Sequence, residues 1–465
     1  METPYKPATA NPLGTEPVSR LLIRFAIPAI ISALLGALYN FIDQAFIGHQ
    51  VGYLGNAATT VAYPITIVCG AVALLFGIGA TVHFNLLQGK GNTNAALQYG
   101  GNGVAMLMIS SVVLMILTLA FITPILYLFG ANAEILPLAR SYLRITALGF
   151  PFLLLTTGGT LLIRGDGSPG YTLFCSAAGV GANILLDWLF LYPLGMEVKG
   201  AAIATVLGQV LSAGLVVRYL RSRMKTGPLT RACFRLTGGR VADMAKIGAA
   251  ASLNQVAMLV TQIALNASLR YYGNQSAYGS SAVLAGAGVC AKLHMVFWAA
   301  IIGFSVGCEP IMGFNYGAKR YGRVRETYRT TILYVLILGA VEMFCFWVLP
   351  RPLLSLFGSG SAAYEDFALR YLHIFMALVL VNGVSPVTMN LFSSTGRARR
   401  GTILSLTRQI FLFLPLLLLL PMIFGLDGIL WAGPAADLGA FLVAVSLAVP
   451  ERRQLIVRES ETDGD

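Results

Sequence analysis

Long apolar runs separated by short polar or basic breaks dominate the chain. A membrane-spanning helix needs about 20 mainly apolar residues, and the breaks divide the sequence into twelve runs of suitable length. The pattern predicts an all-α integral membrane protein with twelve spans. The predicted spans of the first half are 21–46, 57–87, 99–124, 135–162, 169–192 and 199–220. Those of the second half are 244–270, 281–314, 330–350, 366–392, 403–424 and 428–449.

Composition agrees with a membrane protein. Only 11% of the 465 residues are charged, against about 25% in an ordinary globular domain. Seven of the 20 acidic residues lie before Arg20 or after Pro450, so the long middle is poorer in charge still. These values argue against a soluble enzyme, a nucleic-acid-binding protein and a disordered scaffold.

Basic residues gather at one side of the predicted membrane. They surround the linker between the sixth and seventh spans and follow the eighth, tenth and twelfth spans. The positive-inside rule makes this side cytoplasmic, and an even number of spans then places both termini there. The net charge of +12 is thus a signal of topology and of contact with anionic lipid rather than nucleic acid. The expected segments are a cytoplasmic tail without a helix (1–19), an N-terminal six-helix bundle (20–221), a cytoplasmic linker (222–243), a C-terminal six-helix bundle (244–450) and a second cytoplasmic tail (451–465).

The two halves resemble each other at a nearly constant offset. Gly79 and Gly89 recur 228 residues later as Gly307 and Gly317, Leu128-Phe129-Gly130 recurs as Leu356-Phe357-Gly358, and Tyr142-Leu143 recurs as Tyr371-Leu372. Because each half holds six spans, the copies enter the membrane in the same orientation, as parallel repeats. Two such bundles facing each other across a cleft are typical of an alternating-access secondary transporter.

Intramembrane acidic residues are the candidates for energy coupling. The sequence lacks the glycine-rich phosphate loop of an ATP-driven pump, so we expect an ion gradient to supply the energy. A charged residue at the centre of a span costs about 2.5–3.5 kcal/mol on insertion scales and is usually functional. The candidates are Asp43, Asp187, Glu309, Glu342 and Asp437.

Polar residues of three N-terminal spans lie at one predicted depth. Asp43 is near the outer end of span 1, and Asp187 lies about one turn from the outer end of span 5, with Asn183 on the same helical face. Thr205 is near the outer end of span 6. Such a group can share a proton or gather oxygen atoms around Na⁺. The alternatives are that Asp43 only caps its helix at the interface, and that Asn183 and Asp187 form a structural hydrogen bond.

Several motifs resemble the multidrug and toxic compound extrusion (MATE) family, and most closely its MepA-like bacterial branch. They are Tyr39-Asn40-x-x-Asp43 with Phe46-Ile47-Gly48, Asn183-x-x-x-Asp187, Thr205, and Pro310 with Gly313-Phe314-Asn315-Tyr316-Gly317-Ala318. The likeness covers about residues 18–450.

The resemblance implies a MATE-like two-bundle fold and export of drugs or organic cations in exchange for H⁺ or Na⁺. Tyr39, Asp43, Asn183, Asp187 and Thr205 would form the coupling network. Pro28 matches the family's proline in span 1, where a missing N–H permits a bend. The implied setting is the bacterial inner membrane, with the lipid bilayer and small molecules as partners, a functional monomer, and no cofactor besides the coupling ion.

The remaining polar residues are candidates for the substrate cleft. They are Glu309, Glu342, Asp437, Asn254 and Gln255. Glu309 could instead pair with Lys319 or Arg320, and Glu342 with a lysine of span 8. The four histidines are scattered, so no metal site is expected beyond Na⁺ at Asp43, Asn183, Asp187 and Thr205.

Two other functions, a flippase and an enzyme, fit the sequence less well than an exporter does. A lipid-linked precursor flippase of the same superfamily would usually have more spans and a strongly cationic cavity. An integral-membrane enzyme would need a clustered catalytic set, and none is apparent in the sequence. We therefore expect a transporter rather than an enzyme.

Overall fold

The computed structural model describes residues 11–356 and 362–463, and within these ranges every regular element is a helix. Among the described residues, ten helices are long and apolar enough to cross a membrane, and the number rises to twelve when two bent helix pairs are each taken as one span. All twelve overlap the spans predicted from the sequence. The predicted all-α membrane fold is therefore confirmed.

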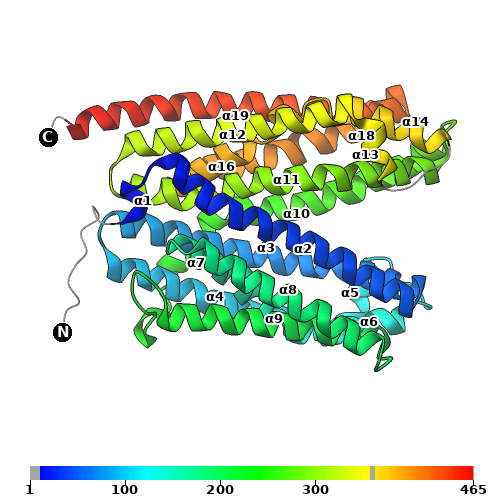
Figure 1. Cartoon of the computed structure of the whole chain (residues 1–465), viewed down its shortest axis with the longest axis horizontal. Helices are drawn as coiled ribbons and strands as arrows, with labels where there is room; N and C mark the ends of the chain where they lie inside the picture. Colours follow the sequence, from blue (N-terminus) through cyan, green and yellow to red (C-terminus); the bar gives the residue numbers. More distant parts are fainter. Residues whose placement is uncertain (1–10, 357–361, 464–465) are drawn as a thin grey trace. The chain divides into compact units, whose positions relative to one another are not determined.

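The chain divides into two compact units, which are described separately. Unit 1 contains residues 11–15 and Ile31–Ser252, and unit 2 contains Glu16–Ile30 and residues 253–463. Two helices, α2 (Val18–Gln50) and α10 (Gly238–Asn274), contribute residues to both units. Their course along the sequence can be followed in Figure 1. Of the repeat motifs noted in the sequence, Phe357-Gly358 lies outside the described residues.

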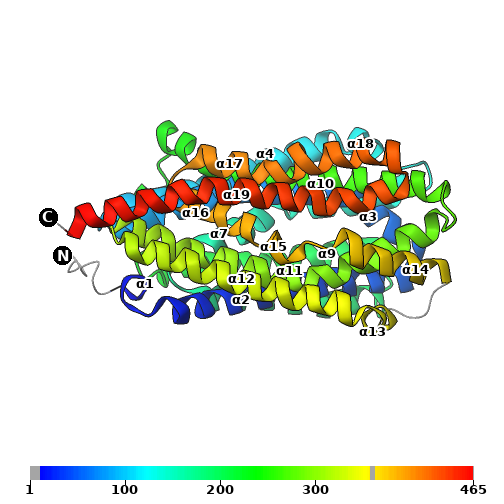
Figure 2. The ribbon, with the colours of Figure 1, turned by 90° about the horizontal axis from the view of Figure 1, so that it is seen from above.

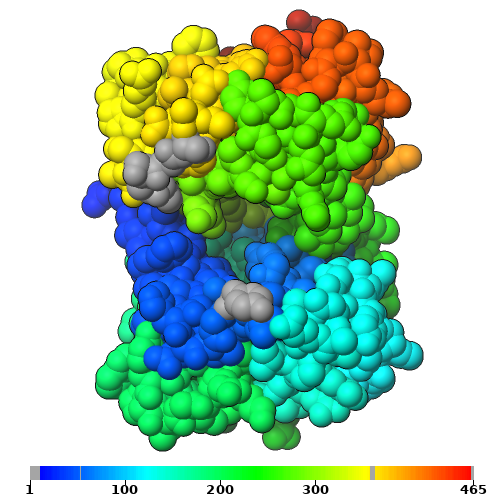
Figure 3. Space-filling view, turned by 90° about the vertical axis from the view of Figure 1, so that its right-hand side faces the viewer, coloured from blue at the N-terminus to red at the C-terminus, as the bar shows by residue number. Residues whose placement is uncertain are grey.

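Unit 1 is a helical bundle around an apolar core that includes Phe76, Leu107 and Phe150. Figure 3 views it from the end at which α2 and α8 terminate, where its blue, cyan and green surfaces adjoin. Besides its parts of α2 and α10, it contains α1 (Pro12–Thr15), α3 (Tyr53–Gly89), α4 (Thr93–Ala120), α5 (Ile122–Leu128), α6 (Leu136–Leu148), α7 (Phe150–Gly165), α8 (Pro169–Leu191), α9 (Glu197–Ser222) and the short helix η2 (Arg231–Phe234).

Two glycines allow α3 and the first part of α10 to touch. A side chain at Gly79 would collide with the carbonyl oxygen of Met244, and one at Gly248 would collide with the carbonyl oxygen of Leu75. Small residues let helix backbones approach this closely. Residues 238–252, which follow the central linker, therefore pack within unit 1.

The N-terminal tail differs from expectation. We expected no helix in residues 1–19, but α1 occupies Pro12–Thr15 and α2 begins at Val18. Proline at the first helical position is favourable, because the N–H it lacks would have no partner within the helix. Residues 1–10 lie outside the described part of the chain.

The central linker is folded onto unit 1. Asn102 of α4 donates hydrogen bonds to the carbonyl oxygens of Cys233 (2.9 Å) and Arg235 (3.1 Å), and accepts one from the Thr237 N–H at 3.2 Å. Asp166, in the turn after α7, is 3% exposed and accepts hydrogen bonds from the Tyr219 hydroxyl, the Lys225 N–H, the Thr226 N–H and the Thr226 hydroxyl. Two buried polar side chains thus hold the linker.

Replacing Asp166 with Ala should lower thermal stability. The substitution leaves four donors without their acceptor, and each donor that is buried and unsatisfied costs about 1–3 kcal/mol. We expect the thermal midpoint of the purified protein in detergent to fall clearly below that of Asp243→Ala, a matched change at an exposed aspartate of α10. Equal midpoints for the two variants would show that the Asp166 contacts do not stabilise the fold.

Unit 2 has its own core, which includes Phe346, Phe367 and Phe413. Besides its parts of α2 and α10, it contains α11 (Ser280–Gly317), α12 (Tyr321–Val348), α13 (Pro350–Ser355), α14 (Ala362–Arg370), η3 (Tyr371–Phe375), α15 (Val379–Asn382), α16 (Val384–Ser394), α17 (Ala398–Leu406), η4 (Thr407–Phe413), α18 (Leu414–Phe424) and α19 (Leu426–Asp463). Several of its helices, among them α12, α16 and α19, can be followed in Figure 2. Because α19 continues through residue 463, most of the predicted C-terminal tail is helical.

The same span is bent in each half of the chain. In the fourth span, α6 and α7 meet at Gly149 with an angle of 54°. In the tenth span, the bend between Ala362–Phe375 and Val379–Ser394 is 52°. Pro151 opens α7 and cannot donate a helical hydrogen bond. The second bend instead follows a π-helical turn, η3, so similar geometry arises from different local sequence.

Candidate functional site

Close packing of α8 against α9 positions the first group of candidate residues. Gly179 of α8 faces Gly208 of α9, and a Cβ atom at Gly208 would lie 2.8 Å from the Gly179 carbonyl oxygen and 3.0 Å from the Asn183 Cβ atom. The two backbones therefore approach each other beside Asn183. This approach brings Asn183 and Asp187 toward Thr205, as their shared predicted depth suggested.

Thr205 is the centre of a small hydrogen-bond network in unit 1. Its Oγ1 atom lies 3.3 Å from the Tyr39 hydroxyl and accepts a hydrogen bond from the Asn183 amide at 3.5 Å. Both Asn183 (3% exposed) and Thr205 (9% exposed) are buried. The network therefore joins α2, α8 and α9 through residues that the sequence analysis had grouped together.

Asp43 and Asp187 lie next to each other in the same unit. The two carboxyl groups are close enough to interact with each other, and Gln44 lies beside Asp43 and Asn183 beside Asp187. Asp43 is 4% exposed and Asp187 is fully buried. Because α2 continues to Gln50, about two turns beyond Asp43, this aspartate lies inside the helix and does not cap it.

Four oxygen atoms of this group have no hydrogen-bond donor within the described residues. They are Asp43 Oδ1, Asn183 Oδ1 and both carboxylate oxygens of Asp187. Buried polar atoms are nearly always hydrogen-bonded, and each exception requires an explanation. Two adjacent buried carboxyl groups are most easily accommodated when they share a proton or coordinate a cation through such oxygens.

Two neighbours of this group were missed by sequence reasoning. Tyr142 of α6 interacts with Tyr39, Thr205 and both aspartates. Gln44 lies beside Asp43 and hydrogen-bonds the Thr59 hydroxyl of α3, with its amide nitrogen 3.0 Å from that oxygen. Tyr142 recurs in the repeat as Tyr371, but this match carried no information about which face of α6 it would occupy.

Two cleft candidates of unit 2 have oppositely charged or titratable partners. Glu342 of α12 is fully buried, and its Oε1 atom lies 2.6 Å from Nδ1 of His294 on α11. Asp437 of α19 is 4% exposed and lies 2.6 Å from Nε of Arg408. Arg408 is in η4, a π-helical turn, and such turns are frequent at functional sites.

The other cleft candidates, Glu309, Asn254 and Gln255, lie on α11 and α10. Glu309 of α11 is buried beside Cys308 and directly precedes Pro310. Asn254 of α10 is half-buried and its amide lies 3.7 Å from the Met258 sulfur, and Gln255 is also half-buried. Their role in substrate binding stays a prediction.

Pro28 lies in the first part of α2 and belongs to unit 2, whose share of this helix ends two residues later at Ile30.

No group of three or more His, Cys, Asp or Glu side chains able to hold a metal ion occurs among the described residues. A Na⁺ site of the type we predict would also use amide and hydroxyl oxygens. It would rest on Asp43, Asn183, Asp187 and Thr205.

Comparisons with known proteins place the chain in a family. The family model MatE matches residues 28–189 and 247–419. The multidrug export protein MepA of Staphylococcus aureus (strain N315) is 26% identical over 451 residues, which cover 96% of each chain. The solved structure of the MATE multidrug transporter DinF-BH is 32% identical and has a TM-score of 0.86, with 94% of this chain and 97% of that chain covered. The solved structure of a multidrug resistance MATE family transporter in an outward-facing conformation is 22% identical and has a TM-score of 0.87, with 98% of this chain and 99% of that chain covered. The chain belongs to the MatE family of multidrug and toxic compound extrusion (MATE) transporters.

Proposed function

We propose that this MATE transporter is a secondary active antiporter that exports organic cations or drugs in exchange for H⁺ or Na⁺. It would act as a monomer in the bacterial inner membrane, with both termini in the cytoplasm. The six-span halves 20–221 and 244–450 would be its two functional bundles. The protein would move its substrates across the membrane without catalysing a chemical reaction.

The paired buried aspartates carry the proposal. Asp43 and Asp187 face each other, and three of their four oxygen atoms lack a donor among the described residues. Two carboxylates in this setting bind a cation more readily than they remain doubly charged, because burial removes the water that would otherwise solvate them. Tyr39 and Asn183, both hydrogen-bonded to Thr205, lie beside the two carboxyl groups and with Thr205 would complete the coupling network.

Binding of the cation would change the state of the first span. Neutralising the aspartates removes their mutual repulsion. This changes the free energy with which α2 packs against α8. Pro28 interrupts the hydrogen-bond ladder of α2, so a bend there costs less than elsewhere in the helix. In the proposed cycle an outward-facing state takes up the cation at Asp43 and Asp187, α2 bends at Pro28, and the drug is released.

Transport by purified protein in liposomes tests this function and identifies the ion. Ethidium is a suitable probe because it is a permanently charged, fluorescent organic cation. Liposomes with an acidic lumen, or with Na⁺ only in the lumen, should accumulate ethidium from outside as the driving cation leaves. We expect one of the two gradients to drive accumulation beyond that in liposomes without protein. The antiporter proposal is wrong if ethidium and tetraphenylphosphonium accumulate under neither gradient, nor under both gradients combined.

A further inference from the structure

A pocket between α12 and α19 of unit 2 is not explained by the coupling site. The two helices contact each other, and Figures 1 and 2 show them side by side. The cavity has a volume of about 560 Å³, within the roughly 300–1,000 Å³ of sites for small molecules. Its lining includes the charged side chains Arg325, Glu326, Arg329, Arg452 and Glu459 and the apolar side chain of Leu333.

The pocket lies where both helices change from charged to apolar. In α12, no charged residue occurs between Arg329 and Glu342, and in α19 none occurs between Asp437 and Glu451. Arg329 and Arg452 are therefore at the membrane boundary on the side we predict to be cytoplasmic. Leu333 is one turn deeper than Arg329 and is 54% exposed, as expected for a side chain that contacts lipid tails. The pocket is thus at the depth of phospholipid headgroups.

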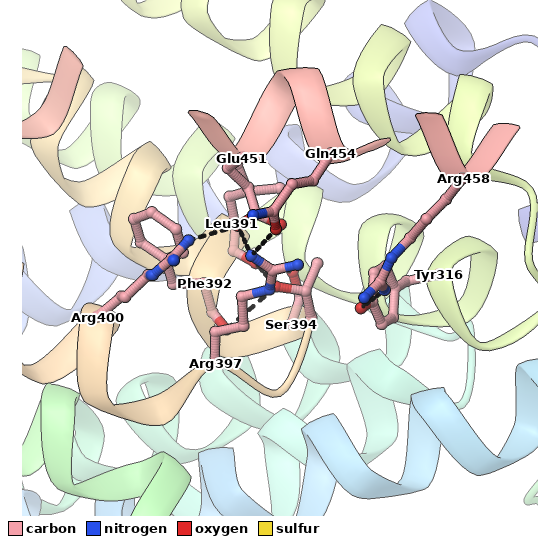
Figure 4. A network of polar contacts seen from close by, with 10 residues as sticks. Tyr316, Leu391, Phe392, Ser394, Arg397, Arg400, Glu451, Gln454 and Arg458 are labelled. Atoms are coloured by element: carbon pink, nitrogen blue, oxygen red, sulfur yellow. Dashed lines mark hydrogen bonds and ion pairs between the residues drawn. The ribbon is translucent and has the colours of Figure 1, made fainter. Parts of the chain in front are cut away.

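Neighbouring contacts hold the end of α19 that lines the pocket. On an adjacent face of α19, Glu451 pairs with Arg397 and Arg400, while Arg458 donates a hydrogen bond to the Tyr316 hydroxyl at 2.6 Å (Figure 4). The Glu459 carboxylate lies against Gly322 and pairs with Arg325 at 3.0 Å. These contacts fix α19 beside α12.

Both signs of charge remain at the mouth of the pocket. Within the described chain, Glu326, Arg329 and Arg452 form no hydrogen bond or salt bridge through their side chains, and all three are exposed. Glu326 and Arg329 lie about one turn apart on α12 and therefore share a face. Two guanidinium groups suit a phosphate, and a carboxylate beside them suits an ammonium group.

We propose that this pocket binds the headgroup of phosphatidylethanolamine from the cytoplasmic leaflet. Arg329 and Arg452 hold the phosphate, Glu326 holds the primary ammonium, and Leu333 contacts the start of the acyl chains. Basic pockets between spans at this face are known to bind anionic headgroups. The carboxylates of Glu326 and Glu459 disfavour a purely anionic headgroup here. A choline headgroup has no N–H to donate to Glu326.

Native mass spectrometry of the full-length protein tests the proposal independently of transport. The protein is released from detergent micelles that contain equal amounts of phosphatidylethanolamine, phosphatidylglycerol and phosphatidylcholine with the same acyl chains. We expect preferential retention of phosphatidylethanolamine. Arg329→Gln and Arg452→Gln should each weaken its retention about tenfold, the usual effect of losing one charge-assisted hydrogen bond. Arg453→Gln is the matched control, because Arg453 is exposed on the same helix and does not line the pocket.

Glu326→Gln separates an ethanolamine site from a general phosphate site. This change should weaken retention of phosphatidylethanolamine and leave that of phosphatidylglycerol unchanged or increased. Equal retention of the three lipids by the unmodified protein would overturn the proposal. So would a stronger retention of phosphatidylglycerol, or equal effects of Arg453→Gln and Arg452→Gln. Thermal midpoints equal to that of the unmodified protein show that each variant is folded.

Discussion

Replacing Asp187 with Asn should abolish ion-driven ethidium transport while the protein remains folded in the membrane. The amide is nearly the same size as the carboxyl group but neither gains nor loses a proton at working pH, and it carries no charge to hold Na⁺. Asp187 is fully buried and both of its oxygens lack a donor among the described residues, so we expect the proposed cation site to depend on it most strongly. Asp43→Asn should have the same effect on transport.

The measurement is ethidium accumulation in liposomes under whichever gradient drives the unmodified protein. Asp243→Asn is the matched control, since this aspartate of α10 is exposed and pairs with Lys246 one turn away. Its transport should equal that of the unmodified protein. The thermal midpoint of Asp187→Asn should be equal or higher, because the change removes a buried carboxyl group from beside another. Full transport by both Asp43→Asn and Asp187→Asn would reject the coupling role.

Replacing Arg408 with Met should destabilise the protein strongly, and a second substitution should reverse most of the loss. Arg408→Met leaves the carboxylate of Asp437, 4% exposed, without its partner at 2.6 Å. Breaking one side of a buried pair typically costs about 3–5 kcal/mol, whereas replacing both partners with apolar residues is often neutral. We therefore expect the double variant Arg408→Met/Asp437→Leu to be nearly as stable as the unmodified protein.

Thermal midpoints in detergent provide the comparison. Lys246→Met, which breaks the exposed Lys246–Asp243 pair, should change the midpoint very little, because exposed pairs contribute at most about 1 kcal/mol. A double variant as unstable as Arg408→Met would contradict the argument. Ethidium transport by the stable double variant then decides the role of Asp437. Unchanged transport would exclude Asp437 from substrate binding, and loss of transport would support its place in the cleft.

The predicted spans and the shared depth of the N-terminal polar residues agree with the structure for simple reasons. Span length depends on the number of apolar residues, which can be counted in the sequence. Asp43, Asp187 and Thr205 come together because short loops fix the depth at which spans 1, 5 and 6 begin and end. Depth alone therefore indicated that these residues could meet.

Features that depend on helix rotation could not be obtained in this way. Tyr142 reaches the aspartates only because of the face that α6 presents to α2 and α9. The pairing of Glu342 with His294 depends on the relative register of α11 and α12. The π-helical turn that carries Arg408 shifts the face of its side chains by part of a turn, which periodicity in the sequence does not indicate.

The paired bends of the fourth and tenth spans bear on the history of the protein. Gly149 lies 228 residues before Ala377, which is within the second break, so the two interruptions occupy equivalent positions. At the same offset, Asp43 and Asp187 correspond to Tyr271 and Pro415, neither of which is acidic. We infer that the broken helix was already present in a founding six-helix chain before duplication. The acidic pair occurs in one copy alone. The two halves therefore share a backbone framework but differ in their intramembrane acidic residues.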